Sequence, residues 1–329
     1  AFDDQAIYHI HQGQTLAQAG AVDLADDHFA AALAGKIQPF ARLHVGVMRA
    51  RNLLAAGRYD AALAAVQVAV TAAAEDPEMP VSGPAQAHAL AAKVQTEVAE
   101  RTAGDAERAA HLAGAVASAR AALAADPSLG EAYAVLGVAL AGLGQFDDAR
   151  RECEKAVRLR PQDAEVRWYL GRILDRQGRW DEAIEVLKQA INLTPQDHRL
   201  HKAIAAVHLH RAQSGAATAK TDCYTAVEEY DIALLLNAAD LEAVVLGGKV
   251  IEAATAAKAD VPVNQQPRPA TTELALERYR GALARDPKFI PAHEAIIALL
   301  SAEKRVDEAI AARRRLIEVD PERFARTAD

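Results

Sequence analysis

The sequence predicts an all-α fold that is built from repeated antiparallel helix pairs. With 51% hydrophobic but only 5% aromatic residues, the 329-residue chain must form its core mainly from alanine, leucine and valine. Alanine has the highest helix propensity of the amino acids, so this composition favours helices. The segment 130–195 also repeats with a period of about 34 residues, which accommodates two helices and a turn.

Two copies of the repeated unit can be aligned position by position within this segment. Positions of very different residue types recur in phase, which is a strong repeat signal. The matching pairs are Leu136 and Leu170, Gly137 and Gly171, Gly144 and Gly178, Phe146 and Trp180, Ala149 and Ala183, Ala156 and Ala190, and Pro161 and Pro195.

Each unit contains the signals of a helix, a turn and a second helix. Gly137 lies on the apolar face of the first helix, where a missing side chain lets the second helix approach closely. Gly144 can end the first helix in a left-handed conformation. Pro161 closes the unit because proline cannot continue a helix. The second helix carries a narrow apolar stripe of Ala149, Cys153 and Ala156. One unit cannot bury both of its faces, so the units must stack into a solenoid.

The length of this period and the helix–turn–helix pattern inside it resemble the tetratricopeptide repeat (TPR) family. The resemblance implies a right-handed α-solenoid, the TPR superhelix. It also implies a protein-interaction scaffold or adaptor, which holds a partner protein or peptide in a concave groove lined by the first helix of each repeat.

The N-terminal part, residues 1–127, predicts three degenerate TPR-like helix pairs. Gly20 interrupts the first pair, the Gly-Arg-Tyr-Asp run at 57–60 forms the turn of the second, and the third breaks near Gly104. The third pair is longer than one repeat period. A loop is expected at 75–84, where three prolines and a glycine occur.

The central part, residues 128–240, holds the well-formed repeats. The third of them begins behind Asp197, a suitable N-cap residue, and a loop at 213–221 is longer than the usual turn. Its second helix is expected to bury Ala226, Tyr230 and Ala233.

The C-terminal part, residues 241–329, predicts further TPR-like pairs with an insertion at 258–269. The run VPVNQQPRP within the insertion has no apolar period, which predicts an exposed loop. In the last pair Lys304 stands where other repeats carry the turn glycine. The whole chain therefore predicts about eight helix pairs.

Composition limits the possible partners and locations. The net charge of −8 and the isoelectric point near 5.8 disfavour nucleic acid as the main partner, since phosphate binding needs a basic surface. No apolar run is long enough to span a membrane. Cys153 and Cys223 show no metal-binding spacing and are not expected to form a disulfide. We expect a bacterial, cytoplasmic protein, with a periplasmic or secreted location after signal cleavage left open.

The sequence contains no catalytic motif that we can identify. It has no phosphate-binding glycine loop, no HExxH and no GxSxG motif, so we expect no enzyme, no cofactor and no metal. His201 and His208 lie two turns apart and could share a metal, but no acidic or cysteine partner is evident near them in the sequence. A structural role between helices is favoured for both.

The TPR resemblance assigns the candidate partner-binding residues. In that family, positions two, five, nine, twelve and thirteen of each repeat usually face the groove. The candidates at these positions are Glu131, Val138, Trp168, Arg172, Asp175, Arg176, Arg199 and Lys202. This groove changes from small and apolar to basic, so we expect a protein or peptide partner with an acidic or C-terminal carboxylate group and an apolar anchor. The asparagines of the family's carboxylate clamp are absent, with Val135 and Tyr169 among the replacements.

Two alternatives remain open at this stage. Trp168 either faces the groove as an exposed anchor or turns into the contact between helices, because one sequence does not determine helix rotation. In addition, the chain could be a structural subunit of a larger multiprotein assembly, membrane-associated or not, or of a homo-oligomer. The degenerate terminal repeats and the two insertions favour this second function.

Overall fold

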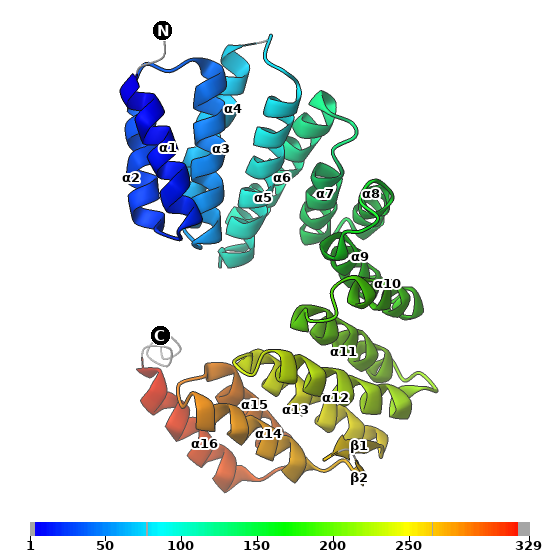
Figure 1. Cartoon of the computed structure of the whole chain (residues 1–329). Helices are drawn as coiled ribbons and strands as arrows, with labels where there is room; N and C mark the ends of the chain where they lie inside the picture. The colour runs from blue at the N-terminus through cyan, green and yellow to red at the C-terminus, as the bar shows by residue number, and fades with distance from the viewer. Residues whose placement is uncertain (1–3, 77, 265, 322–329) are drawn as a thin grey trace. The chain divides into compact units, whose positions relative to one another are not determined.

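The computed structural model describes residues 4–76, 78–264 and 266–321, which form sixteen helices and two short strands (Figure 1). The first eight helices are α1 (Asp4–Gln18), α2 (Val22–Ala34), α3 (Pro39–Ala55), α4 (Tyr59–Glu75), α5 (Ser82–Arg101), α6 (Asp105–Ala125), α7 (Gly130–Gly142) and α8 (Phe146–Leu159). The others are α9 (Ala164–Arg176), α10 (Trp180–Leu193), α11 (His198–Gln213), α12 (Ala219–Leu236), α13 (Leu241–Ala257), α14 (Thr272–Arg285), α15 (Ile290–Ala302) and α16 (Val306–Val319). The fold is an all-α solenoid of helix pairs, as predicted.

The chain divides into two compact units, residues 1–173 and 174–329, with the division inside α9. In the first unit the first helices of successive pairs contact one another in order, α1 with α3, α3 with α5 and α5 with α7. In the second unit α11 contacts α13, and α13 contacts α15. Each unit therefore has an inner row of first helices, which is the face that a groove-binding solenoid uses.

Close packing within the central pair α7–α8 depends on Gly137. A Cβ atom added there would overlap the Cys153 sulfur and would lie 2.9 Å from the Ala149 carbonyl oxygen. Ala149, Cys153 and Ala156 are all fully buried, which confirms the predicted stripe.

The turn residues also behave as the repeat predicts. Gly57, Gly144 and Gly178 all have positive φ angles, between 71° and 77°. Lys304 takes the same left-handed conformation, with φ of 59°, even though it carries a side chain. The turn geometry is thus retained where the glycine is not.

The insertion at 258–269 is exposed only in part, and it is more regular than an exposed loop. It contains an antiparallel pair, β1 (Asp260–Val263) and β2 (Gln266–Pro269), with Val261 opposite Arg268. Strand β1 packs against α12 and α13, and Val261 is fully buried. The hairpin was missed because a pair of strands this short is stabilised by cross-strand pairing and two buried residues, Val261 and Pro262, which leave no apolar period in the sequence.

Two loops are shorter than predicted. Helix α5 begins at Ser82, so its first turn occupies the end of the expected loop at 75–84. Helix α12 begins at Ala219, within the expected loop at 213–221. Within α12, the side chains of Ala226, Tyr230 and Ala233 are fully buried, as predicted.

Candidate partner-binding site

The first unit contains a small cavity on the inner row of helices, between α5, α7 and α9. Its volume is about 190 Å³, below the range of about 300–1,000 Å³ that is typical of small-molecule sites. The lining residues are Lys93, Thr96, Glu97, Glu100, Glu131, Ala134, Val135, Val138, Arg160, Asp163, Glu165, Val166 and Tyr169. A space of this size suits one side chain of a partner.

The cavity brings together several positions that the repeat assigns to the groove. Glu131 and Val138, both predicted site residues, line it from α7, and Ala134 lies between them. Glu165 occupies the same repeat position on α9 as Glu131 does on α7. The inner face that the repeat implies is therefore a real, hollowed surface in this part of the molecule.

The sequence-based prediction did not include the residues of α5 that line the cavity. Glu97 and Glu100 on α5 face the same cavity, together with Lys93 and Thr96. A signal for Glu97 was present in the sequence, because Glu97, Glu131 and Glu165 follow one another at intervals of one repeat period. The longer third pair hid this phase, since its turn lies near Gly104 and not where the repeat would place it.

Some charged groups of the cavity are already paired. Arg160 binds Asp163 with a nitrogen–oxygen distance of 2.8 Å, and Arg101 binds Glu97 at 2.9 Å. The Tyr169 hydroxyl donates a hydrogen bond to Glu165 Oε1 over 3.0 Å. Burial raises the pKa of Glu100, and the neighbouring Glu97 raises it further. The site is thus rich in carboxylates that lie close together.

Trp168 and Arg172 form a stacked pair on α9. The Arg172 guanidinium carbon lies 4.7 Å from the centre of the Trp168 ring, and the Tyr169 ring centre lies 5.0 Å from it. Trp168 is half-buried and its indole nitrogen is fully buried, while Arg172 is exposed. The Arg172 side chain therefore covers the Trp168 ring. Trp168 is neither a fully exposed anchor nor a fully buried contact between helices.

Two of the predicted basic residues, both in the second unit, are engaged by carboxylates of the chain itself. Arg199 binds Asp197 at 2.8 Å, and Lys202 lies 3.0 Å from Asp240 and 2.9 Å from Glu242. Burial lowers the pKa of Lys202, but the hydrogen bonds that its ammonium group donates to Glu242 and Asp240 outweigh this effect and raise the pKa. A partner would have to compete with these internal pairs to bind Arg199 or Lys202.

Asp175 and Arg176, the other predicted residues of the second unit, flank His210. His210 Nδ1 lies 2.8 Å from Asp175 Oδ2. The hydrogen bond to Asp175 raises the pKa of His210, while burial and the charge of Arg176 lower it, and the rise prevails.

This arrangement predicts a pH-dependent contact. The pKa of His210 is higher in the folded than in the unfolded chain. The Asp175–His210 pair therefore contributes its full stabilisation of the fold below about pH 6.5, and this stabilisation is lost as pH rises through the folded pKa. We expect Asp175→Asn to lower the pKa of His210, as followed by NMR titration of its imidazole. Arg176→Gln, the control, should shift the pKa upward. An unchanged pKa in Asp175→Asn would contradict the assignment.

The histidines of α11 have the structural role that the sequence favours, but their acidic partners were missed. His201 Nδ1 lies 2.8 Å from Glu229, and His208 Nδ1 lies 2.8 Å from the buried Asp222. Both carboxylates come from α12, the second helix of the pair, and not from the neighbourhood of the histidines in the sequence. Within the described residues, no group of three or more potential ligands could hold a metal ion.

The two cysteines are free thiols, each fully buried. Burial raises the pKa of Cys153 to about 12 and that of Cys223 to about 11. Thiols with such high pKa values remain protonated near neutral pH and are poor nucleophiles. Their role is to pack the second helices of their pairs.

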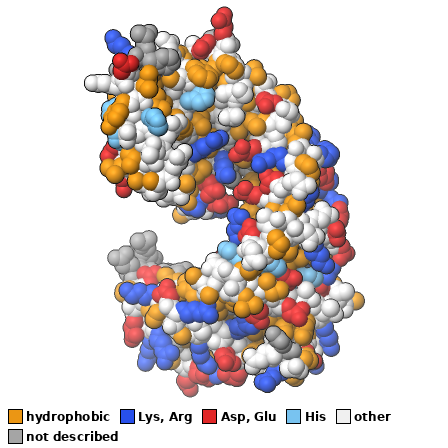
Figure 2. All heavy atoms as spheres, in the orientation of Figure 1, with side chains coloured by type: hydrophobic (Ala, Val, Ile, Leu, Met, Phe, Trp, Pro, Cys, Tyr) orange, Lys and Arg blue, Asp and Glu red, His pale blue; other side chains and the backbone are white. Residues whose placement is uncertain are grey.

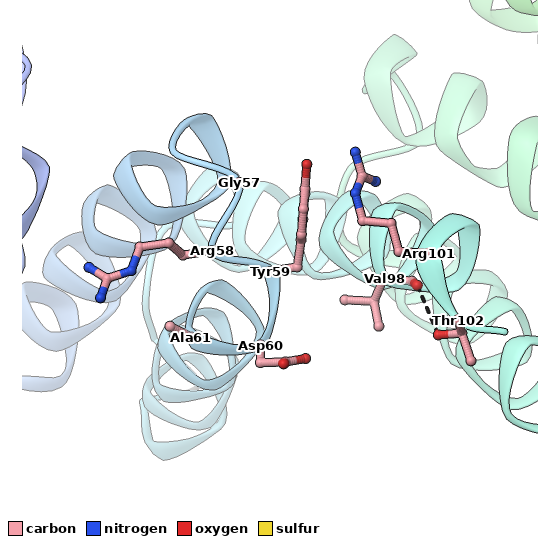
Figure 3. Close-up of a pocket in the computed structure, with 8 residues that line it drawn as sticks. All are labelled: Gly57, Arg58, Tyr59, Asp60, Ala61, Val98, Arg101 and Thr102. Atoms are coloured by element: carbon pink, nitrogen blue, oxygen red, sulfur yellow. Dashed lines mark hydrogen bonds between the residues drawn. The ribbon is translucent and has the colours of Figure 1, made fainter. Parts of the chain in front are cut away.

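A second, larger hollow of about 470 Å³ lies beside the α3–α4 turn and the end of α5 (Figure 3). In it the Arg101 guanidinium stands over the Tyr59 ring, 3.9 Å from its centre. Arg58, on the other side of the turn, pairs with Asp23. None of the predicted site residues lines this hollow, so we place the candidate site at the smaller cavity.

Two further observations concern the surface and the helices. Figure 2 shows acidic and basic side chains intermingled on the visible face of the molecule. None of the described helices is both long and apolar enough to cross a lipid bilayer.

Comparison with known proteins identifies the repeat. Residues 140–207 and residues 99–163 match two family models described as tetratricopeptide repeat. A search of curated proteins finds no significant match.

Solved structures share the fold at low sequence identity. A tetratricopeptide repeat protein from Parabacteroides merdae is 14% identical, with a TM-score of 0.62, over 91% of this chain and 100% of that chain. Human IFIT1, solved as a dimer with m7Gppp-AAAA, is 16% identical, with a TM-score of 0.52, over 84% of this chain and 72% of that chain. Residues 99–207 therefore contain tetratricopeptide repeats, and the fold that the chain shares with these solved structures extends over most of its sequence.

Proposed function

We propose that this protein is an interaction scaffold whose inner row of helices binds an extended segment of a partner protein. The general scaffold role is supported by its tetratricopeptide repeats. Binding on the inner row is supported by the cavity between α5, α7 and α9, because side chains at groove positions of successive repeats line it. Under this proposal the chain acts by binding, without a reaction of its own.

The side chains suggest which groups of the partner bind where. Val138 and Ala134 offer apolar contact for an anchor residue. Arg172 lies on α9 and is exposed, so it can receive the acidic or C-terminal carboxylate group expected from the sequence. Arg199 and Lys202 are less suited to this role because each already binds carboxylates.

Selection of short random peptides against the purified full chain tests the proposal. We expect peptides that bind the wild-type chain and lose at least tenfold in affinity for Val138→Arg, which fills the cavity with a long charged side chain. The matched control is Ala117→Arg, which places the same side chain on the exposed face of α6, a second helix. Circular dichroism of each variant verifies that the helices are intact.

The outcome of the selection is decisive for the groove. Peptides that bind Val138→Arg as well as they bind the wild-type chain would move the interface away from the inner row. Failure to select any peptide that depends on Val138 would have the same meaning.

The alternative function, a structural subunit or homo-oligomer, has one observation in its favour. Helix α16 exposes the apolar side chains of Val306, Ile310 and Ile317, and Val306 is 62% exposed. Light scattering of the purified chain distinguishes the two functions. A mass equal to one chain would count against self-assembly through this helix.

A further inference from the structure

The cavity between α5, α7 and α9 has a floor and a rim of different chemistry. Ala134, Val135 and Val166 form apolar contacts at its base, and each is less than 9% exposed. Val138 adds a half-buried apolar surface beside them. The apolar part is therefore a place for carbon atoms, and the polar groups stand around it.

The rim carries an excess of negative charge. Five carboxylate side chains line the cavity, against the two cations Lys93 and Arg160. Arg160 already binds Asp163, and Glu97 already binds Arg101. Within the described part of the chain, the carboxylates of Glu131 and Glu165 form no ion pair, and the one hydrogen bond that another side chain donates to either carboxylate comes from the Tyr169 hydroxyl to Glu165. Negative charge is thus left over after the internal pairs are made.

The region next to Glu100 adds to this excess. Glu100 lies beside Glu97, and both burial and that neighbour raise its pKa, which means that its charged form is disfavoured in the absence of another cation. Arg172 and Arg101 act in the opposite direction but do not cancel the rise. An additional positive charge here would relieve the repulsion between neighbouring carboxylates.

The shape and the charge of the cavity disfavour other kinds of ligand. A metal ion is disfavoured because no group of three or more ligands converges in the described residues. A carboxylate of the partner is disfavoured because it would meet like charges on three sides, from α5, α7 and α9. A small-molecule ligand would need more volume than about 190 Å³ to be well enclosed.

We propose that this cavity takes a lysine or arginine side chain of the bound segment, with its methylene stem on Val135, Val138 and Val166 and its charged head between Glu131 and Glu165. Long cationic side chains bury their stems on apolar surface while the head group keeps polar contacts, which is the pattern that this cavity offers. The proposal rests on the proposed function, since it names the residue that the groove recognises. The partner therefore combines a basic residue here with the acidic group proposed for Arg172.

The test uses the peptides selected on the full chain. In each peptide that loses affinity for Val138→Arg, every lysine is replaced in turn by norleucine, which keeps the stem and removes the charge, and every arginine by citrulline. We expect one position to cost about tenfold in affinity for the wild-type chain. This loss should shrink at high salt concentration, because the pair is partly exposed.

A double-mutant cycle ties that position to the cavity. In the variant Glu131→Gln/Glu165→Gln the neutral and charged peptides should bind within about twofold of each other, because the partners of the charge are gone. The control is Glu107→Gln, an exposed carboxylate at the start of α6, in which the tenfold difference should persist.

The possible outcomes separate the two proposals. Peptides that depend on Val138 but have no basic residue, or bind equally well after neutralisation, would overturn the cation pocket and leave the groove function standing. A tenfold loss that persists in Glu131→Gln/Glu165→Gln would also overturn it, since the charge would then bind elsewhere. If no peptide depends on Val138, the groove function fails and the pocket fails with it.

Discussion

Replacing Asp222 by alanine is expected to cost the second unit about 3 kcal/mol of unfolding free energy. The Asp222 side chain is 1% exposed and binds three groups, His208 Nδ1 at 2.8 Å, Arg211 Nε at 3.0 Å and the Thr218 hydroxyl at 2.7 Å. Burial raises the pKa of Asp222, but the bonds from Arg211, His208 and Thr218 prevail and hold it below its ordinary value. The carboxylate is therefore charged at neutral pH.

The large effect is expected because the substitution removes the main partner of two side chains between α11 and α12. Without Asp222, the Arg211 guanidinium, whose side chain is 18% exposed, and the buried His208 ring lose their main partner between α11 and α12. A buried charge without its partner destabilises far more than the loss of an exposed pair. Urea denaturation followed by circular dichroism measures the difference.

A matched control is available on the same guanidinium. Asp181, at the start of α10, also binds Arg211, but its side chain is 91% exposed. Asp181→Ala should cost less than about 1 kcal/mol, as is usual for solvent-exposed pairs. Equal losses for Asp222→Ala and Asp181→Ala would show that burial of the network does not control its strength.

The second large effect is expected from Gly137→Ala, which should destabilise the first unit by about 2 kcal/mol although alanine is the better helix former. The new methyl group would overlap Cys153 and approach the backbone oxygen of Ala149, so α7 and α8 would have to separate. The gain of about 1 kcal/mol in helix propensity does not offset this clash. Thermal and urea denaturation both measure the change.

The same substitution at Gly281 is the control for Gly137→Ala. Gly281 lies inside α14, and an added Cβ would meet no atom within 4 Å. Gly281→Ala should therefore stabilise the protein by about 0.5–1 kcal/mol, because only the backbone entropy and propensity terms remain. Stabilisation in both variants would contradict the close helix contact at Gly137.

Much of the fold was predictable because its signals are local. The spacing of Gly137, Gly144 and Pro161 sets a helix, a turn and a stop within one repeat unit, and the structure shows each of them. Where a repeat lacks the turn glycine, the start of its second helix can shift. Ala110 stands one repeat period before Gly144, and without a glycine there α6 extends back to Asp105. The short hairpin at 260–269 was missed for a related reason, since its stabilising contacts are made with α12 and α13.

The candidate site was predictable only in part. The repeat phase placed Glu131 and Val138 on the inner face, because groove positions follow from helical periodicity. The charge of the site was not predictable in the same way. Lys202 is paired by Asp240 and Glu242, which lie 38 and 40 residues further along the chain. Glu100 reaches the cavity from α5, in a pair whose turn is out of phase with the repeat.

By itself, the sequence determined the helix pairs, their order and the inward face of α7, because these depend on glycine, proline and apolar residues within one repeat. Only the tertiary structure decided which charges from different helices meet. Ion pairs such as Arg211 with Asp222, and the carboxylates gathered between α5, α7 and α9, join residues from different helices. Coulomb interactions depend on distance in space, and that distance is set by the stacking of the helices and not by their separation along the chain.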